Sequence, residues 1–147
     1  MNSGVTSIVE CPAPVLSSNA LRILSNASLI SAGTERMLVG FGKGSYVDKA
    51  RQQPEKVKMV LDKVVTDGFL TTFEAVKSKL SQPLPLGYSN VGVVEKVSPG
   101  LVGFKVGDRV VSNGAHADIV VVKNNLCAKI PAEVDDESAA FTVVGSI

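Results

Sequence analysis

The chain is poor in the residues that bind metals or form disulfides. Among its 147 residues it has two cysteines, one histidine and no tryptophan. Zinc sites generally need three or four converging Cys, His or carboxylate ligands, so this composition offers little material for one. Cys11 and Cys127 lie far apart in the sequence. In a chain without an export signal, we expect two reduced, partly buried thiols rather than a disulfide.

The sequence also lacks an excess of one charge and any long apolar run. Fifteen Lys and Arg residues nearly balance fourteen Asp and Glu residues, so nucleic acid and anionic membranes are not expected as partners. No apolar run approaches the roughly 20 residues that span a bilayer. Residues 1–4 lack the basic flank and apolar segment of a signal peptide. With 45% hydrophobic residues, the composition predicts one globular, cytoplasmic domain.

The clearest pattern that is present is a β-rich region from Pro85 to Val111. It holds β-branched residues in a strand-like run, a turn at residues 98–100, and a second break at Gly107-Asp108 before another strand. Four more stretches have strand-like composition. They are residues 5–10, 20–30 with a break or bulge near Ser25-Asn26, 117–122 and 126–130.

Two helices are expected between these strands. Pro54 to Asp67 carries apolar residues at i, i+3, i+4 and i+7, with proline in the first turn and glycine just after the end. A second helix is expected at about Thr71 to Leu80, which makes a helical hairpin. A packed structural appendage is the simpler interpretation of its apolar stripe. A lid or a docking surface for another domain is the alternative.

Two further segments carry local signals. Glycines at 40, 42 and 44 predict a flexible or tightly turned loop over residues 37–45, without the Lys-Ser/Thr pair of a phosphate-binding loop. Asp135 predicts the N-cap of a last helix. That helix stays apolar to Ile147 with no stop signal, so we expect the natural chain to continue.

Three segments resemble a known family. They are S-A-G-T-E-R (residues 31–36), P-L-G-Y-S-N-V-G-V-V (85–94) and F-K-V-G-D-R-V (104–110). They are similar to the N-terminal GroES-like domain of the medium-chain dehydrogenase/reductases. The resemblance implies a mainly β fold with helices: a partly open β-barrel over residues 1–147, with the helical hairpin inserted at about 46–82. It also implies a downstream Rossmann domain, absent from this sequence, that binds NAD or NADP.

The resemblance also points to the positions where zinc-dependent relatives keep their metal ligands. The cysteine of the active-site loop is replaced by Ala32. The segment that reads G-H-E-x-x-G in those relatives is here Gly87-Tyr88-Ser89-Asn90-Val91-Gly92. The pairing of S-A-G-T-E-R with P-L-G-Y-S-N-V-G-V-V resembles a zinc-free, bacterial subgroup that is often joined to a second oxidoreductase module. No metal is expected.

The same comparison implies candidate catalytic residues. Thr34 aligns with the family's proton-relay hydroxyl, Tyr88 replaces the zinc histidine, and His116 aligns with an aromatic position. A phenol can donate a proton or a hydrogen bond to a developing alkoxide, and an imidazole can transfer a proton near neutral pH. The alternatives are that Tyr88 is a strand-edge tyrosine with its ring in the core and its hydroxyl at the rim, and that His116 has a structural role. The expected substrate pocket consists of Ala32, Gly33, Ser89 and Asn113. No cofactor-binding residue is assigned.

The predicted function is the substrate-side domain of an NAD(P)-dependent, zinc-independent oxidoreductase. Its substrate would be a small carbonyl compound, sugar or enone, and its partner its own downstream Rossmann domain. The full-length protein could form a homo-oligomer, and these 147 residues alone are expected to be inactive. The alternative is a non-enzymatic GroES-like scaffold or docking module, which the lost zinc ligands also fit.

Overall fold

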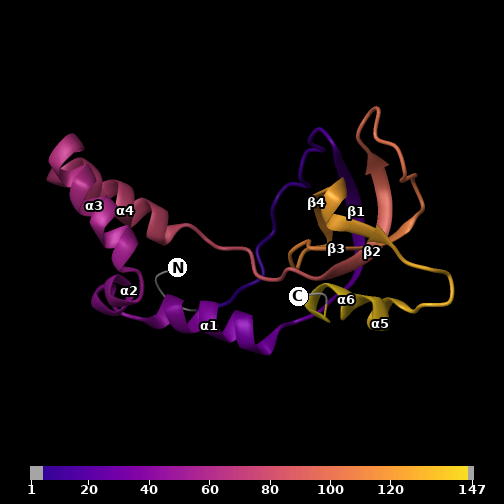
Figure 1. The fold of residues 1–147 in the computed structure, drawn as a ribbon, viewed down its shortest axis with the longest axis horizontal. Helices are drawn as coiled ribbons and strands as arrows, with labels where there is room; N and C mark the ends of the chain where they lie inside the picture. Colours follow the sequence, from indigo (N-terminus) through magenta and orange to yellow (C-terminus); the bar gives the residue numbers. More distant parts are fainter. Residues whose placement is uncertain (1–4, 146–147) are drawn as a thin grey trace. The chain divides into compact units, whose positions relative to one another are not determined.

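The computed structural model describes residues 5–145, and they form two compact units (Figure 1). The first unit contains Gly33–Leu84 together with the N-terminal residues up to Ile8. The second contains Val9–Ala32 and the chain from Pro85 onward. Each unit is described by itself. No helix within the described residues is long and apolar enough to cross a membrane.

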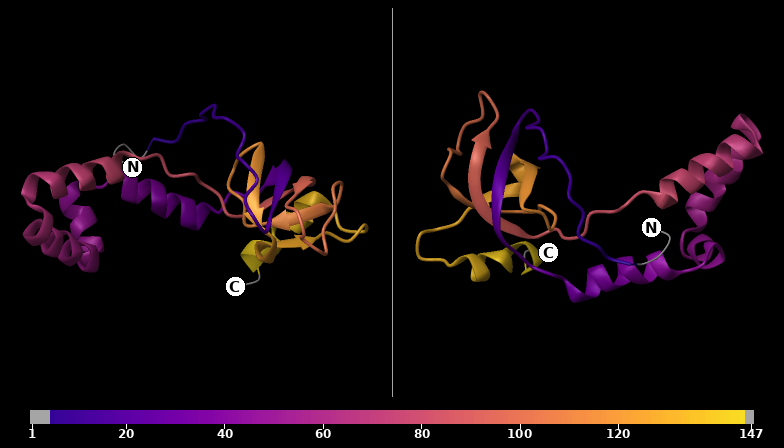
Figure 2. Two further views of the ribbon diagram at one scale, coloured as in Figure 1. Left: turned by 90° about the horizontal axis from the view of Figure 1, so that it is seen from above. Right: turned by 180° about the vertical axis from the view of Figure 1, so that it is seen from behind.

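The second unit is built on a five-stranded antiparallel sheet with the strand order β4-β1-β2-β3-β5 (Figures 1 and 2). The order is linear, so the sheet does not close into a full barrel, and the predicted partly open barrel is confirmed. The strands are β1 (Ala20–Ser28), β2 (Asn90–Val97), β3 (Arg109–Ser112), β4 (Ile119–Lys123) and β5 (Cys127–Lys129).

The strand predictions succeed where apolar residues can be buried. The register of β1 against β2 shifts between Ser25 and Ala27, which is the bulge expected from the sequence. Buried side chains of four strands form a hydrophobic core: Leu21, Ile23, Val94, Val110, Val120 and Val122. The strand expected at residues 5–10 is wrong. Val5, Ile8 and Val9 are exposed, and within residues 5–145 no strand pairs with them.

The loop predicted over residues 37–45 is also wrong, because a helix, α1 (Ala32–Lys43), occupies most of it. Glu35 in the first turn and Lys43 in the last turn both suit the helix dipole. A glycine inside a helix costs only about 1 kcal/mol, which such end effects and packing can offset. A capping box between Ser45 and Asp48 then begins α2 (Tyr46–Gln52).

The predicted helical hairpin is present in the first unit. Its helices are α3 (Pro54–Asp67) and α4 (Phe69–Ser81), and they pack on each other. Gly68 joins them with φ of 86°, a conformation that favours glycine. The buried Thr72 hydroxyl donates to the Gly68 carbonyl at 2.9 Å, which ties the first turn of α4 to the joint.

The 3₁₀ turn η1 (Asn124–Leu126) connects β4 to β5. After β5 the chain forms two short helices, α5 (Asp136–Ala140) and α6 (Thr142–Gly145). The predicted N-cap is confirmed, because the Asp135 side chain accepts from the Ser138 amide at 2.7 Å. The Asp136 carboxylate accepts from Arg109 on β3 at 2.6 Å and from Asn26 on β1 at 2.9 Å. The expectation about the chain end at Ile147 lies outside the described residues.

Candidate functional site

His116 is held at a junction of three segments in the second unit. Its backbone amide donates to the Leu86 carbonyl at 2.8 Å, which joins the loop after β3 to the segment before β2. Its ring Nδ1 lies 2.8 Å from the hydroxyl of Ser28 at the end of β1. The side chain is half-buried. A histidine fixed on both its backbone and its ring has a defined orientation, as an acid or base requires.

Gly87 makes this placement of His116 sterically allowed. A Cβ atom at Gly87 would lie 2.7 Å from the Cγ and Nδ1 atoms of His116, closer than real Cβ contacts. Gly87 also has φ of 92°, in the region that L side chains rarely adopt. The next residue is Tyr88, which is half-buried. The structure thus brings the segment that carries Tyr88 against the ring of His116.

Ser89 faces into the protein. Its hydroxyl is fully buried and donates to the Ala140 carbonyl at 2.5 Å, at the end of α5. Its own carbonyl accepts from the Leu29 amide at 3.0 Å. These bonds satisfy backbone groups that would otherwise be buried without partners. The Ser89 hydroxyl is therefore bonded inside the protein. Its place in the substrate pocket stays a prediction.

A partly buried polar cluster supports the loop that carries His116. The Asn90 amide nitrogen donates to the Ser25 hydroxyl at 2.8 Å, and that hydroxyl donates to the Ala117 carbonyl at 2.5 Å. The Ser25 amide donates to the Asp118 carbonyl at 2.9 Å. Among the described residues, the buried Asn90 Oδ1 has no hydrogen-bond partner. The cluster ties residues 117–118 to β1 and β2, close to His116 in the chain.

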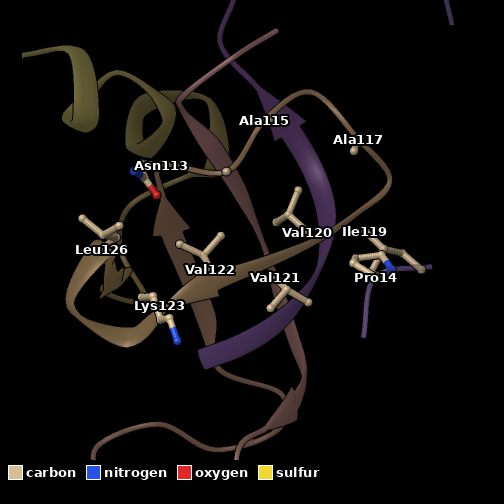
Figure 3. Close-up of a pocket in the computed structure, with 11 residues that line it drawn as sticks. Pro14, Asn113, Ala115, Ala117, Ile119, Val120, Val121, Val122, Lys123 and Leu126 are labelled. Carbon is tan, nitrogen blue, oxygen red and sulfur yellow. The ribbon is translucent and has the colours of Figure 1, made fainter. Parts of the chain in front are cut away.

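The remaining predicted site residues lie elsewhere. Thr34 and Gly33 are exposed on α1 in the first unit, and Ala32 begins that helix. A common site for Thr34 and Tyr88 therefore stays a prediction. Asn113 is exposed in the second unit. It borders an open cavity of about 420 Å³ (Figure 3).

That cavity lies along β4 and is mostly apolar. Ile119, Val121 and Leu126 are among its lining residues, with Pro14 at one end (Figure 3). Of the residues predicted for catalysis or the pocket, it includes Asn113 alone. A second cavity of about 250 Å³ also includes Asn113, beside Cys127 and Val143. Neither cavity includes Tyr88 or His116, so we place the candidate site by side-chain chemistry rather than by cavity size.

The donor set at the expected zinc positions does not suit the metal. Ala32 has no donor atom, and the Ser89 hydroxyl is used by a backbone carbonyl. Within residues 5–145, no three His, Cys, Asp or Glu side chains gather where they could hold a metal ion. Cys127 is free, and burial raises the pKa of its thiol to about 11. It is therefore protonated at neutral pH, and the thiolate is the form that binds metals.

The sequence interpretation missed Ser28 and the role of Gly87. No local signal identifies Ser28, because it meets His116 only through the pairing of β1 and β2. Gly87 belongs to the segment that resembles the family, between Leu86 and Tyr88. Nothing in that segment indicates that Gly87 contacts His116. The cysteine prediction was correct about free thiols and wrong about Cys11, which is exposed.

Comparisons with known proteins agree with this architecture. Residues 61–132 match the alcohol dehydrogenase GroES-like domain family. No curated protein sequence matches the chain. A mycobacterial quinone oxidoreductase is 26% identical with a TM-score of 0.55, over 92% of this chain and 32% of that one. The family match over residues 61–132 and the shared fold support an N-terminal GroES-like domain of the medium-chain dehydrogenase/reductase type.

Two more distant structures share the fold. Escherichia coli quinone oxidoreductase, solved with NADPH, is 20% identical with a TM-score of 0.59 over 91% of this chain and 32% of its own. Escherichia coli galactitol-1-phosphate dehydrogenase is 15% identical with a TM-score of 0.61, over 95% of this chain and 39% of its own. The chain thus spans about a third of the length of the structures it matches.

Proposed function

We propose that this chain is the substrate-side domain of an NAD(P)-dependent oxidoreductase that works without catalytic zinc. Its substrate is a small carbonyl compound, a sugar or an enone. The observation that carries the proposal is the seating of His116 against Gly87, beside Tyr88, in a domain of the dehydrogenase family. The nicotinamide cofactor supplies the hydride and binds mainly to a downstream domain.

The residues of this chain supply proton and hydrogen-bond chemistry. Hydride transfer to a carbonyl leaves negative charge on the carbonyl oxygen, which a hydrogen-bond donor stabilises. Tyr88 carries a hydroxyl that can donate to that oxygen. The ring of His116 is oriented by its contact with Ser28 at 2.8 Å. It can donate a proton to the product oxygen, or accept one from it in the reverse reaction. Thr34 stays a proposed catalytic residue on the basis of the family resemblance alone.

The test uses the intact oxidoreductase chain that contains this domain. Oxidation of NADH and NADPH is followed with a quinone, an enone and a keto sugar as acceptors. General acid–base groups contribute about 10²–10⁴-fold, so Tyr88→Phe and His116→Gln are each expected to lower kcat by at least tenfold. Glu133→Gln, at an exposed position of the same unit, is the matched control and leaves kcat unchanged.

The rival function predicts a different result. A GroES-like scaffold needs neither group for chemistry, so Tyr88→Phe and His116→Gln would then leave turnover at the wild-type rate. Equal effects from Glu133→Gln would indicate a general loss of folded protein instead. Circular dichroism of each variant separates these outcomes.

A further inference from the structure

The hairpin of α3 and α4 carries an apolar face that no described residue of the first unit covers. Half-buried Val57, Val60 and Val64 lie on the side of α3 that suits packing on α4. By helical periodicity, Leu61 and Val65 lie about a quarter turn away from that stripe. Both are exposed, at 60% and 88%. The hairpin therefore buries one side of α3 and leaves a second apolar side open.

The second helix extends this surface. Among the described side chains of α4, Thr72 and Val76 are the covered ones, and Phe69 and Phe73 lie on average about a sixth of a turn from them, in the same sense as on α3. Because α4 turns back along α3 (Figures 1 and 2), an offset in the same sense places both pairs on one side of the hairpin. The two phenyl rings stack with centroids 6.1 Å apart, yet both side chains are more than half exposed.

We call this surface the hairpin face; its members are Leu61, Val65, Phe69, Leu70 and Phe73. Their exposed fractions range from 57% to 88%. Side chains of this kind offer on the order of 200 Å² each when fully exposed, so the face presents roughly 600–700 Å². Two copies packed together would bury roughly 1,300 Å², which lies within the range of about 1,200–2,000 Å² for specific interfaces.

The charges around the hairpin face favour an identical surface as its partner. By the same helical periodicity, Lys58 and Asp62 border the face on α3, and Glu74 and Lys77 border it on α4. Two cations and two anions give the border no net charge. A two-fold interface requires a surface that complements itself, because each patch meets an identical patch. A strongly charged partner would instead require a border of the opposite sign.

We propose that the hairpin face is a homodimer interface, in which α3 and α4 of two copies form a four-helix layer around a two-fold axis. The stacked Phe69 and Phe73 rings are its centre, because large aromatic side chains dominate interface energetics. The proposal does not depend on the oxidoreductase function. An interface at the lower end of the size range, with a central aromatic pair, is expected to have a micromolar dissociation constant.

Sedimentation velocity of the 147-residue chain over a wide concentration range tests this proposal. The wild type is expected to dimerise with a micromolar dissociation constant. Val65→Lys and Phe73→Lys place like charges opposite each other across the two-fold axis, so each should raise that constant at least tenfold. Met59→Lys is the matched control. Met59 is an exposed apolar residue on the far side of α3, so its variant should dimerise as the wild type does.

Far-UV circular dichroism verifies that each variant keeps its helices. If Phe73→Lys loses helix content, Val65→Lys decides, because Val65 is almost fully exposed and basic residues suit the last turns of a helix. A wild type that stays monomeric at all concentrations overturns the proposal, since the face is then covered by the rest of the chain or by another partner. A dimer that both variants leave intact overturns it as well.

Discussion

The ring Nδ1 of His116 lies 2.8 Å from the hydroxyl of Ser28, although 88 positions separate them in the chain. Ser28 ends β1, and His116 lies in the loop that leads from β3 to β4. The antiparallel pairing of β1 with both β2 and β4 brings these segments together. The candidate site is therefore a product of the sheet topology and not of any local motif.

Ser28→Ala tests whether this contact orients the imidazole. Removing the hydroxyl takes away the partner of Nδ1, so the nitrogen chemical shifts of the His116 ring are expected to change. Ser28→Thr keeps the hydroxyl and should keep the wild-type shifts. Long-range ¹H–¹⁵N NMR spectra of the chain, which contains a single histidine, provide the measurement. Identical spectra for wild type and Ser28→Ala would show that the contact does not orient the ring.

Gly87→Ala is expected to destabilise the fold more than a comparable glycine substitution. The new methyl group would meet His116 at 2.7 Å, and alanine is strained at φ of 92°. Strain of about 1–2 kcal/mol and overpacking of about 1–3 kcal/mol together predict a loss of about 3 kcal/mol. Gly103→Ala, at φ of 97° with nothing within 4 Å, should lose only the strain. Urea unfolding measures both, and equal losses would mean that His116 moves aside easily.

Ser89→Ala distinguishes a structural serine from a pocket serine. It removes the buried hydrogen bond to the Ala140 carbonyl and leaves that acceptor unsatisfied. The expected loss is about 1–2 kcal/mol in the free energy of unfolding. Asn113→Ala, at an exposed position, should change it by less than about 0.5 kcal/mol. A Ser89→Ala protein as stable as the wild type would argue against the structural role.

The stability of the second unit should fall in acid through Asp136. Hydrogen bonds from Arg109, then from Asn26, hold the pKa of Asp136 below its usual value. A carboxyl with a lowered folded-state pKa stabilises the fold above its unfolded pKa, about 3.9. That stabilisation is lost as the pH falls through the folded-state pKa. Urea unfolding between neutral pH and pH about 2.5 should show a steeper decline in wild type than in Asp136→Asn. Equal slopes would contradict this account.

The two cysteines should differ in reactivity. Cys11 is exposed, whereas burial raises the pKa of Cys127 to about 11. Because the thiolate is the reactive form, an alkylating reagent at neutral pH should label Cys11 first. Cys127 should react at a comparable rate only after denaturation. Mass spectrometry of peptides from a time course gives both rates, and early labelling of Cys127 would show that it is not protected.

Much of the fold could be predicted because its signals are local. The helix from Pro54 to Asp67 has proline at its start, glycine after its end and one apolar stripe between them, and the structure shows the same bounds. The bulge near Ser25 also left a local signal. In contrast, the glycines at 40 and 42 indicated a loop but lie within α1. Gly42 is buried within α1, and packing of this kind can offset the low helix preference of glycine.

The candidate site was only partly predictable. The resemblance pointed to Tyr88 and His116, but Ser28 and the contact at Gly87 depend on strands that pair across long sequence separations. Val5, Ile8 and Val9 show the same limit of prediction from sequence. Their composition favours a strand, yet no strand lies beside them in the described structure. Strand pairing is a property of the whole sheet, and a single segment does not specify it.

The most direct test of the proposed function is NAD(P)H oxidation by the intact oxidoreductase chain after exhaustive treatment with a zinc chelator. Metal content is measured on the same sample. The account predicts turnover at the untreated rate with far less than one zinc per chain. Loss of turnover on chelation, with recovery when zinc is restored, would contradict it, because the domain would then depend on a metal that Ala32 and Tyr88 are not suited to bind.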